Sequence, residues 1–93
     1  MHEIVWALID DTTRQAGLLE PAIRDRERER VIRLSRKAAR ACAGVGANAA
    51  AAALQAIGKH AGKSEFDVCY AALASLRAEI DTLRNILATA AAK

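Results

Sequence analysis

The residues best able to do chemistry are four cations that recur at helical spacing. They are Arg33, Arg36, Lys37 and Arg40. An apolar set recurs at similar steps on the other side of the same segment and comprises Val31, Leu34, Ala38, Cys42 and Val45. Residues three and four apart share one face of an α-helix, so the two sets predict a helix with an apolar inner face and a cationic face towards water.

Positive charge is concentrated in and around this segment. The chain has 93 residues, a net charge of +3 and a pI of about 9.2. From Arg30 to Lys63 it contains seven lysines and arginines and no acid. Such asymmetry suits an acidic partner, either protein or nucleic acid, although a solvated helix face is the alternative interpretation.

Carboxylates and serines indicate no catalytic site. Asp10 and Asp11 are adjacent, and Glu79 and Asp81 are two apart, so neither pair shares a helix face. Nothing in the sequence suggests a histidine and an acid beside a serine. The sequence therefore predicts that the protein is not an enzyme.

Cysteines and histidines likewise predict no metal or cofactor site. Cys42 and Cys69 both fall on apolar stripes, as small core residues of a reducing compartment do. There is no Cys-x-x-Cys motif and no Cys/His cluster at metal-ligand spacing. His2 and His60 are interpreted as ordinary surface histidines.

Composition and periodicity predict an all-α fold. Hydrophobic residues make up 53% of the chain, aromatics only 3%, and there is one proline, Pro21. We expect one domain, residues 1–93, that forms an antiparallel up-down-up-down four-helix bundle. The first expected helix starts near His2 or Glu3, and the second runs from about Glu27 to Gly44. The third runs from about Ala47 to His60, and the fourth begins at Ser64.

Capping signals mark these boundaries. Asp25 is predicted to cap the N-terminus of the second helix. Ser64 is predicted to cap the fourth helix, together with Asp67 three residues later. Gly44 and Gly46 are predicted to end the second helix. The buried face of the first helix is predicted to include Ile4, Val5, Leu8, Ile9, Thr12, Ala16, Leu19 and Ile23. That of the last is predicted to include Phe66, Cys69, Leu73, Leu76, Ile80, Leu83, Leu87 and Ala90.

The regular stripe of the last helix could serve a bundle core or a seam between two chains, so a monomer and a homodimer both remain open. The start of the chain has no cationic segment followed by a long apolar run, and the alanine run from Ala47 to Ala53 is too short to span a bilayer. We expect a cytoplasmic protein without membrane contact.

The order of these features resembles that of a histidine-phosphotransfer (HPt) domain, the four-helix carrier of bacterial phosphorelays. The resemblance covers most of the chain. The segment LIDDTTRQAGLLEPAI (8–23) looks like the family's first helix, and CAGVGA (42–47) looks like the small-residue exit of its second. The long amphipathic last helix is also similar. Within two-component signalling, such a domain binds receiver domains and histidine kinases.

The active centre departs from the family pattern. Members place an exposed histidine ten residues before the closing glycine, then a lysine and a glycine three and four residues after the histidine. Counted back from Gly46, these positions hold Arg36, Ala39 and Arg40. Arginine stays protonated and is not a useful nucleophile, so the resemblance implies a fold that no longer carries phosphate.

The expected function is a non-catalytic, HPt-like module for protein–protein interaction. It would dock a response-regulator receiver domain or a histidine kinase through its arginine face. The residues predicted to bind the partner are Arg33, Arg36, Lys37, Ala39, Arg40 and Ala43. The alternative is a small basic bundle that binds nucleic acid or acts as an oligomeric structural protein. Nucleic acid is the less favoured partner because no aromatic residue stands among the cations for base stacking.

Overall fold

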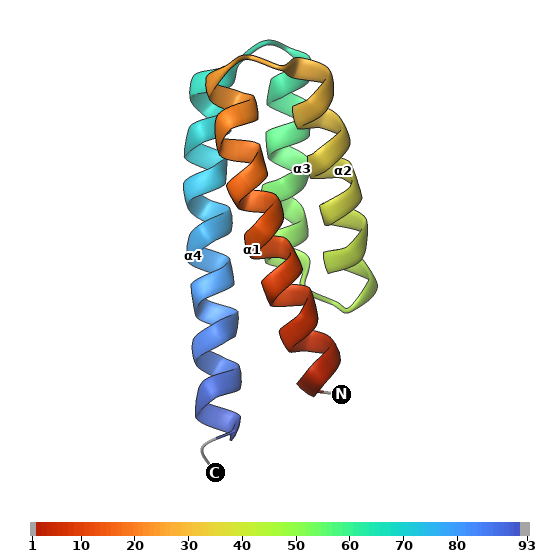
Figure 1. Cartoon of the computed structure of the whole chain (residues 1–93), viewed down its shortest axis with the longest axis vertical. Helices are drawn as coiled ribbons and strands as arrows, with labels where there is room; N and C mark the ends of the chain where they lie inside the picture. Colours follow the sequence, from red (N-terminus) through yellow and green to blue (C-terminus); the bar gives the residue numbers. More distant parts are fainter. Residues whose placement is uncertain (1, 92–93) are drawn as a thin grey trace.

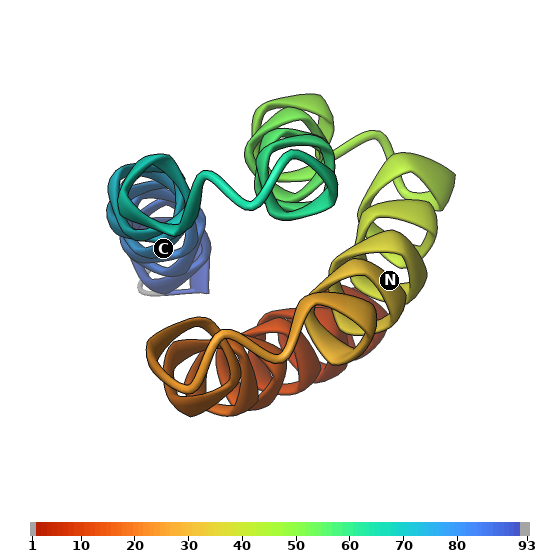
Figure 2. The same cartoon turned by 90° about the horizontal axis from the view of Figure 1, so that it is seen from above.

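Four antiparallel helices form the bundle (Figure 1). The computed structural model describes residues 2–91, and the side chains of residues 6–90. The helices are α1 (His2–Arg24), α2 (Arg28–Gly44), α3 (Asn48–Gly62) and α4 (Phe66–Ala91). Each helix packs on the next along the chain and α4 packs on α1, so the four surround one core (Figure 2). The predicted all-α four-helix architecture is confirmed.

The helices differ in length, and this difference shapes the bundle. α1 and α4 have 23 and 26 residues, whereas α2 and α3 have 17 and 15. At one end of the molecule α1 and α4 therefore extend past the turn between α2 and α3 (Figure 1). Pro21 lies in the last turn of α1, where its carbonyl still accepts a hydrogen bond from the Asp25 N–H at 2.9 Å.

The turn between α2 and α3 depends on a glycine. The Ala47 N–H donates to the Cys42 carbonyl at 2.9 Å, and the Gly46 N–H donates to the Ala43 carbonyl at 3.1 Å. This pair of bonds is a Schellman motif, which satisfies carbonyls that the helix end leaves free. The motif needs a left-handed residue, and Gly46 has φ of +81°. The predicted role of Gly46 in ending this helix is confirmed.

The other two turns repeat this geometry without glycine. Arg26 and Ser64 occupy the left-handed position with φ of 56° and 59°. Their amides donate to the carbonyls of Ile23 and Ala61, at 3.0 Å in both cases. The hydrogen bonds of the motif offset the unfavourable backbone conformation of a residue with a Cβ atom.

Two capping predictions are wrong. The residue before α2 is Glu27, not Asp25, and its side chain makes no capping bond. Ser64 lies in the turn that follows α3, two residues after Gly62, and α4 begins only at Phe66. The motif fixes which residue immediately precedes the next helix. Before α2 and α3 that residue is Glu27 and Ala47, and neither side chain makes a capping bond.

The core is built from aliphatic and small side chains, as the composition indicates. Its buried apolar residues are Ile9, Ala16, Leu19, Ala22, Ile23, Val31, Ala38, Ala39, Cys42, Ala50, Ala51, Leu54, Ile57, Ala61, Cys69, Leu73, Leu76 and Ile80. Thr12 is also buried, as predicted, and Leu8, Phe66, Leu83 and Leu87 are half-buried. Ala90 is exposed, contrary to prediction, and Ile4 and Val5 lie outside the residues whose side chains are described.

On α2 the predicted inner face is correct at three of its five positions. Val31, Ala38 and Cys42 are buried, while Leu34 is half-buried. Val45 is 47% exposed because it lies in the turn after the helix, where helical periodicity no longer applies.

The α2–α3 contact is close because glycine and serine meet there. A Cβ atom at Gly58 would lie 2.8 Å from Oγ of Ser35. Ser35 is itself buried and donates a hydrogen bond to the Ile32 carbonyl at 3.1 Å. The absence of a side chain at Gly58 therefore allows the two helices to approach.

Candidate functional site

The four cations on α2 form one exposed surface. Arg33, Arg36, Lys37 and Arg40 all project into solvent and are called the cationic face below. From the first to the last, seven residues advance about 10 Å along the helix axis. The sequence prediction that these residues share an exposed face is confirmed.

No residue of the cationic face forms an ion pair within the part of the chain that the structure describes. Ion pairs there join Arg24 to Asp25, Arg30 to Glu27, His60 to Glu65, and Arg77 to Glu20. None involves a residue of the cationic face. Their charges therefore act together on anything that approaches α2.

The distribution of charge over the bundle reinforces this polarity. α2 carries six lysines and arginines and a single acid, Glu29, and α3 carries Lys59 and no acid. α1 has four acids and two arginines, and α4 has three acids and two arginines. One side of the molecule is thus strongly cationic, whereas the other is mildly acidic.

Two hollows lie on either side of Arg36 and Arg40. One, of about 490 Å³, is on the surface of α2, and its lining includes Glu29, Arg33 and Lys37. The other, of about 440 Å³, lies between α2 and α3 and is called the α2–α3 groove. Its lining is Ile32, Ser35, Arg36, Ala39, Arg40, Ala43, Leu54, Gln55, Gly58 and Lys59.

The groove contains the two alanines predicted to bind the partner. Ala39 is only 5% exposed, so it gives the groove its shape and offers little surface for direct contact. Ala43 is exposed at the end of α2 and also lines the groove. The structure brings these alanines together with Arg36 and Arg40, while Arg33 and Lys37 line only the outer hollow.

Sequence reasoning did not single out Gln55 and Lys59 of α3. Both are exposed and line the groove opposite the arginines of α2. Two signals were available, because Lys59 lies in the acid-free stretch and Gln55 is four residues before it on the same helix face. The sequence alone could not show which residues of α2 they oppose.

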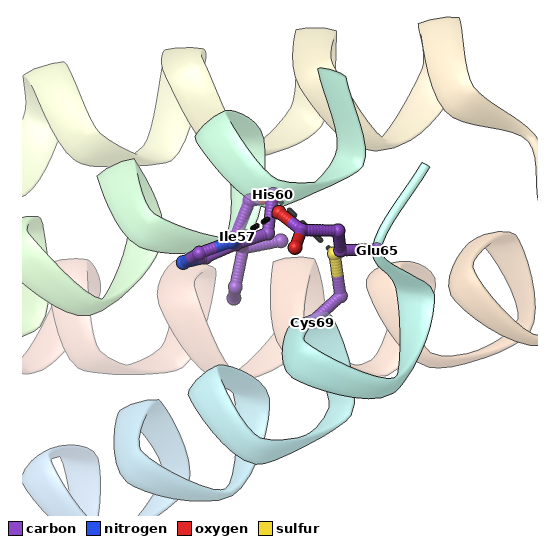
Figure 3. Close-up of polar contacts among 4 residues, drawn as sticks. All are labelled: Ile57, His60, Glu65 and Cys69. Atoms are coloured by element: carbon purple, nitrogen blue, oxygen red, sulfur yellow. Dashed lines mark hydrogen bonds and ion pairs between the residues drawn. The ribbon is translucent and has the colours of Figure 1, made fainter. Parts of the chain in front are cut away.

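His60 lies in a different setting at the end of α3. Its Nδ1 is 3.0 Å from Oε1 of Glu65 (Figure 3). The hydrogen bond from this imidazole lowers the pKa of the Glu65 carboxyl, helped by the nearby charges of Lys59 and Lys63. The backbone N–H of Glu65 also donates to the His60 carbonyl at 2.9 Å. His60 is therefore a structural residue of the α3–α4 turn. The side chain of His2 lies outside those described.

The cysteines belong to the core, as predicted. Cys69 donates a hydrogen bond from Sγ to the Ile57 carbonyl at 3.4 Å (Figure 3). The Sγ of Cys42 is hydrogen-bonded to Oγ1 of Thr12 at 3.7 Å. Burial raises the pKa of both thiols, so they remain protonated and unreactive near neutral pH.

Two further findings concern ligands and membranes. Among the described residues, no three His, Cys, Asp or Glu side chains are grouped closely enough to bind a metal ion. Over the same part of the chain, no helix combines the length and the hydrophobicity needed to cross a membrane.

Comparison with known proteins gives no relative. The chain matches no family model, no curated protein and no solved structure. Any function is therefore inferred from the cationic face and the α2–α3 groove.

Proposed function

We propose that this chain is a non-catalytic, HPt-like docking module that binds an acidic protein partner through its cationic face. The partner class is a response-regulator receiver domain or a histidine kinase. The observation that carries the proposal is the exposure of Arg36 and Arg40 on a helix surface where no described acid pairs with them.

Charge complementarity explains the choice of partner. Receiver domains present a cluster of aspartates at their phosphorylation site, and cations opposite such a cluster favour both encounter and correct orientation. Arg36 stands where the HPt resemblance places the phosphorylated histidine. An arginine there could occupy the acidic cluster and block phosphoryl transfer.

The chemistry of the site is consistent with docking rather than phosphate carriage. Phosphoryl carriage needs a nucleophilic imidazole, and α2 contains no histidine. His60, on α3, has Nδ1 bound to Glu65 and lies outside both hollows that flank Arg36. We therefore expect that acetyl phosphate and a phosphorylated receiver domain leave no phosphate on this chain.

The direct test is binding of purified receiver domains to the full chain, measured by calorimetry in moderate and high salt. The double variant Arg36→Glu/Arg40→Glu should weaken binding at least about tenfold, equivalent to about 1.4 kcal/mol. Arg14→Glu/Arg24→Glu is the matched control, because it reverses two charges at exposed positions of α1. Equal loss in both variants, or stable labelling of the wild-type chain by acetyl phosphate, would contradict the proposal.

A pull-down from native lysate distinguishes binding to a protein partner from the alternative, binding to nucleic acid. We expect a receiver-domain protein or a histidine kinase to remain bound after nuclease treatment. Bound material that disappears with nuclease, together with a steep loss of DNA or RNA affinity as salt is added, would support a nucleic-acid partner instead.

A gain-of-function variant tests the proposed register. Arg36→His, Ala39→Lys and Arg40→Gly together would restore the residues that the HPt resemblance places on α2. We expect this triple variant to accept phosphate from a phosphorylated receiver domain, measured by transfer of radiolabel. Arg33→His in the wild-type background is the control, since it places an imidazole one turn away.

A further inference from the structure

We propose that the α2–α3 groove is the binding site for an amphipathic helix of the acidic partner. The apolar ridge of that helix would lie on the floor of the groove, and its carboxylates would meet Arg36, Arg40 and Lys59. The inference rests on the proposed function only in requiring an acidic partner, and it adds a second helix, α3, to the binding site.

The floor of the groove is low because the residues that form it are small. Ser35 and Ala39 are buried on α2, and Gly58 on α3 has no side chain. Leu54 is also fully buried beneath the groove, and Ile32 is half-buried at one end. The close α2–α3 contact leaves room for long side chains only at the rims.

The dimensions of the groove suit a short helix. α2 and α3 are antiparallel neighbours (Figure 1). The α2 residues that line the groove recur at steps of one to three from Ile32 to Ala43, so the groove follows the axis of α2. From Ile32 to Ala43 its α2 wall extends about 16 Å, which is about three turns of helix, and from Leu54 to Lys59 its α3 wall extends about 8 Å, or about one and a half turns. A third helix can therefore place one ridge of side chains in the groove that two packed helices leave between them.

Charge defines the chemistry of the occupant. Arg36 and Arg40 stand on the α2 rim, Lys59 stands on the α3 rim, and Gln55 adds an uncharged amide beside Lys59. Cations on both rims select a helix whose apolar ridge has carboxylates on both flanks. The apolar floor and the lack of an aromatic residue in the lining favour a protein helix over single-stranded nucleic acid, which needs stacking platforms.

The probe is a synthetic helical peptide of about three turns, with leucines three and four residues apart and glutamates on both sides of them. Fluorescence anisotropy of the labelled peptide is measured as the full chain is titrated. Replacement of the glutamates by lysine should abolish binding, and replacement of the leucines by alanine should weaken it about tenfold or more.

Matched variants of the chain locate the peptide. Lys59→Glu should weaken peptide binding about fivefold or more, while Lys63→Glu, in the neighbouring turn, should change it less than about twofold. Ala43→Trp fills the groove and should prevent binding. Ala41→Trp, also exposed on α2 but outside the groove lining, should not. Circular dichroism of each variant confirms that it is folded.

The outcomes separate this inference from the proposed function. If receiver domains bind and lose affinity with Arg36→Glu/Arg40→Glu, but Lys59→Glu and Ala43→Trp have no effect on the peptide, the groove is not the binding site for the helix and the docking function stands. If the peptide binds and responds to both variants while no receiver domain binds, the groove inference stands and the partner class is wrong. A labelled DNA duplex that binds more tightly than the peptide, or peptide binding that Ala41→Trp removes equally, would overturn the inference.

Discussion

Glycine occurs at both the α2–α3 contact and the α1–α4 contact, but it plays different parts there. At Gly58, between α2 and α3, an added Cβ atom would lie 2.8 Å from Oγ of Ser35. At Gly17, on α1 beside α4, it would meet nothing within 4 Å. An added Cβ atom at the first glycine would force the Ser35 hydroxyl to move, whereas one at the second would displace nothing.

The same contrast governs the charged residues. Across the α1–α4 contact, Arg77 donates to Glu20 at 3.0 Å and Arg84 donates to Oγ1 of Thr13 at 3.1 Å. Across the α2–α3 contact, small side chains meet, and the cations of both helices remain on the rims without a described acid. The long polar side chains at the α1–α4 contact are therefore engaged with one another, whereas those on the rims of the α2–α3 groove have no ion-pair partner among the described residues.

The largest change in stability is expected from Gly58→Val, at the α2–α3 contact. The new side chain would collide with buried Ser35 and separate α2 from α3, which should lower the free energy of unfolding by about 2–3 kcal/mol. Urea denaturation measures the change. Gly58→Ala alone should also destabilise the bundle, because its Cβ atom would lie 2.8 Å from Oγ of Ser35. The double variant Ser35→Ala/Gly58→Ala removes that oxygen and should recover most of the wild-type stability. If Gly58→Val proves neutral, the two contacts do not differ as described.

The opposite sign is expected at Gly17. Gly17→Ala meets no neighbouring atom and replaces glycine inside an exposed stretch of helix, so it should raise stability by about 0.5–1 kcal/mol. An increase in the urea midpoint with an unchanged slope would show this effect. A destabilised Gly17→Ala would mean that α1 and α4 also need a glycine at their contact.

The turns give a smaller effect. Ser64 has φ of 59° in the same motif that Gly46 occupies between α2 and α3. Ser64→Gly should stabilise the bundle by up to about 1 kcal/mol, because glycine adopts this conformation without strain. Gly46→Ser is the reciprocal variant and should lower the melting temperature. The prediction fails if the two substitutions shift it in the same direction.

The ion pair at the α1–α4 contact is expected to contribute less. The charged side chains of Arg77 and Glu20 are about half exposed, so their coupling should be no more than about 0.5 kcal/mol. A double-mutant cycle with Arg77→Ala and Glu20→Ala measures it. A coupling well above this value would show that the α1–α4 contact depends on charge more than its exposure indicates.

The pH dependence of Glu65 should be the smallest effect. Its pKa is held below the ordinary value of 4.5 by His60, so the ionised carboxylate stabilises the folded state. That contribution is complete above pH 4.5 and is lost as the pH falls through the lowered pKa. Unfolding measured at several acidic pH values should show a shallower decline in Glu65→Gln than in the wild-type chain. Identical curves of stability against pH for the two proteins would contradict this prediction.

Periodicity in the sequence was sufficient for much of this description. The spacing of Arg33, Arg36 and Arg40 placed them on the outer face of α2, and the stripe of α4 predicted its buried positions at Cys69 and Leu73. These predictions succeed because the helical repeat is a local property that fixes direction around the axis. Helix ends were less predictable, as Asp25 and Ser64 show, because hydrogen bonds across the turn select the backbone conformation there.

The sequence by itself therefore determined the four helices, their inner faces and the unbalanced charge of residues 30–63. Only the tertiary structure decided that Lys59 would lie across a groove from Arg36 and Arg40. The distance between α2 and α3 sets this juxtaposition, and that distance depends on how Gly58 and Ser35 meet. Helical repeat acts within one segment, whereas the groove arises from contact between residues more than 20 positions apart in the chain.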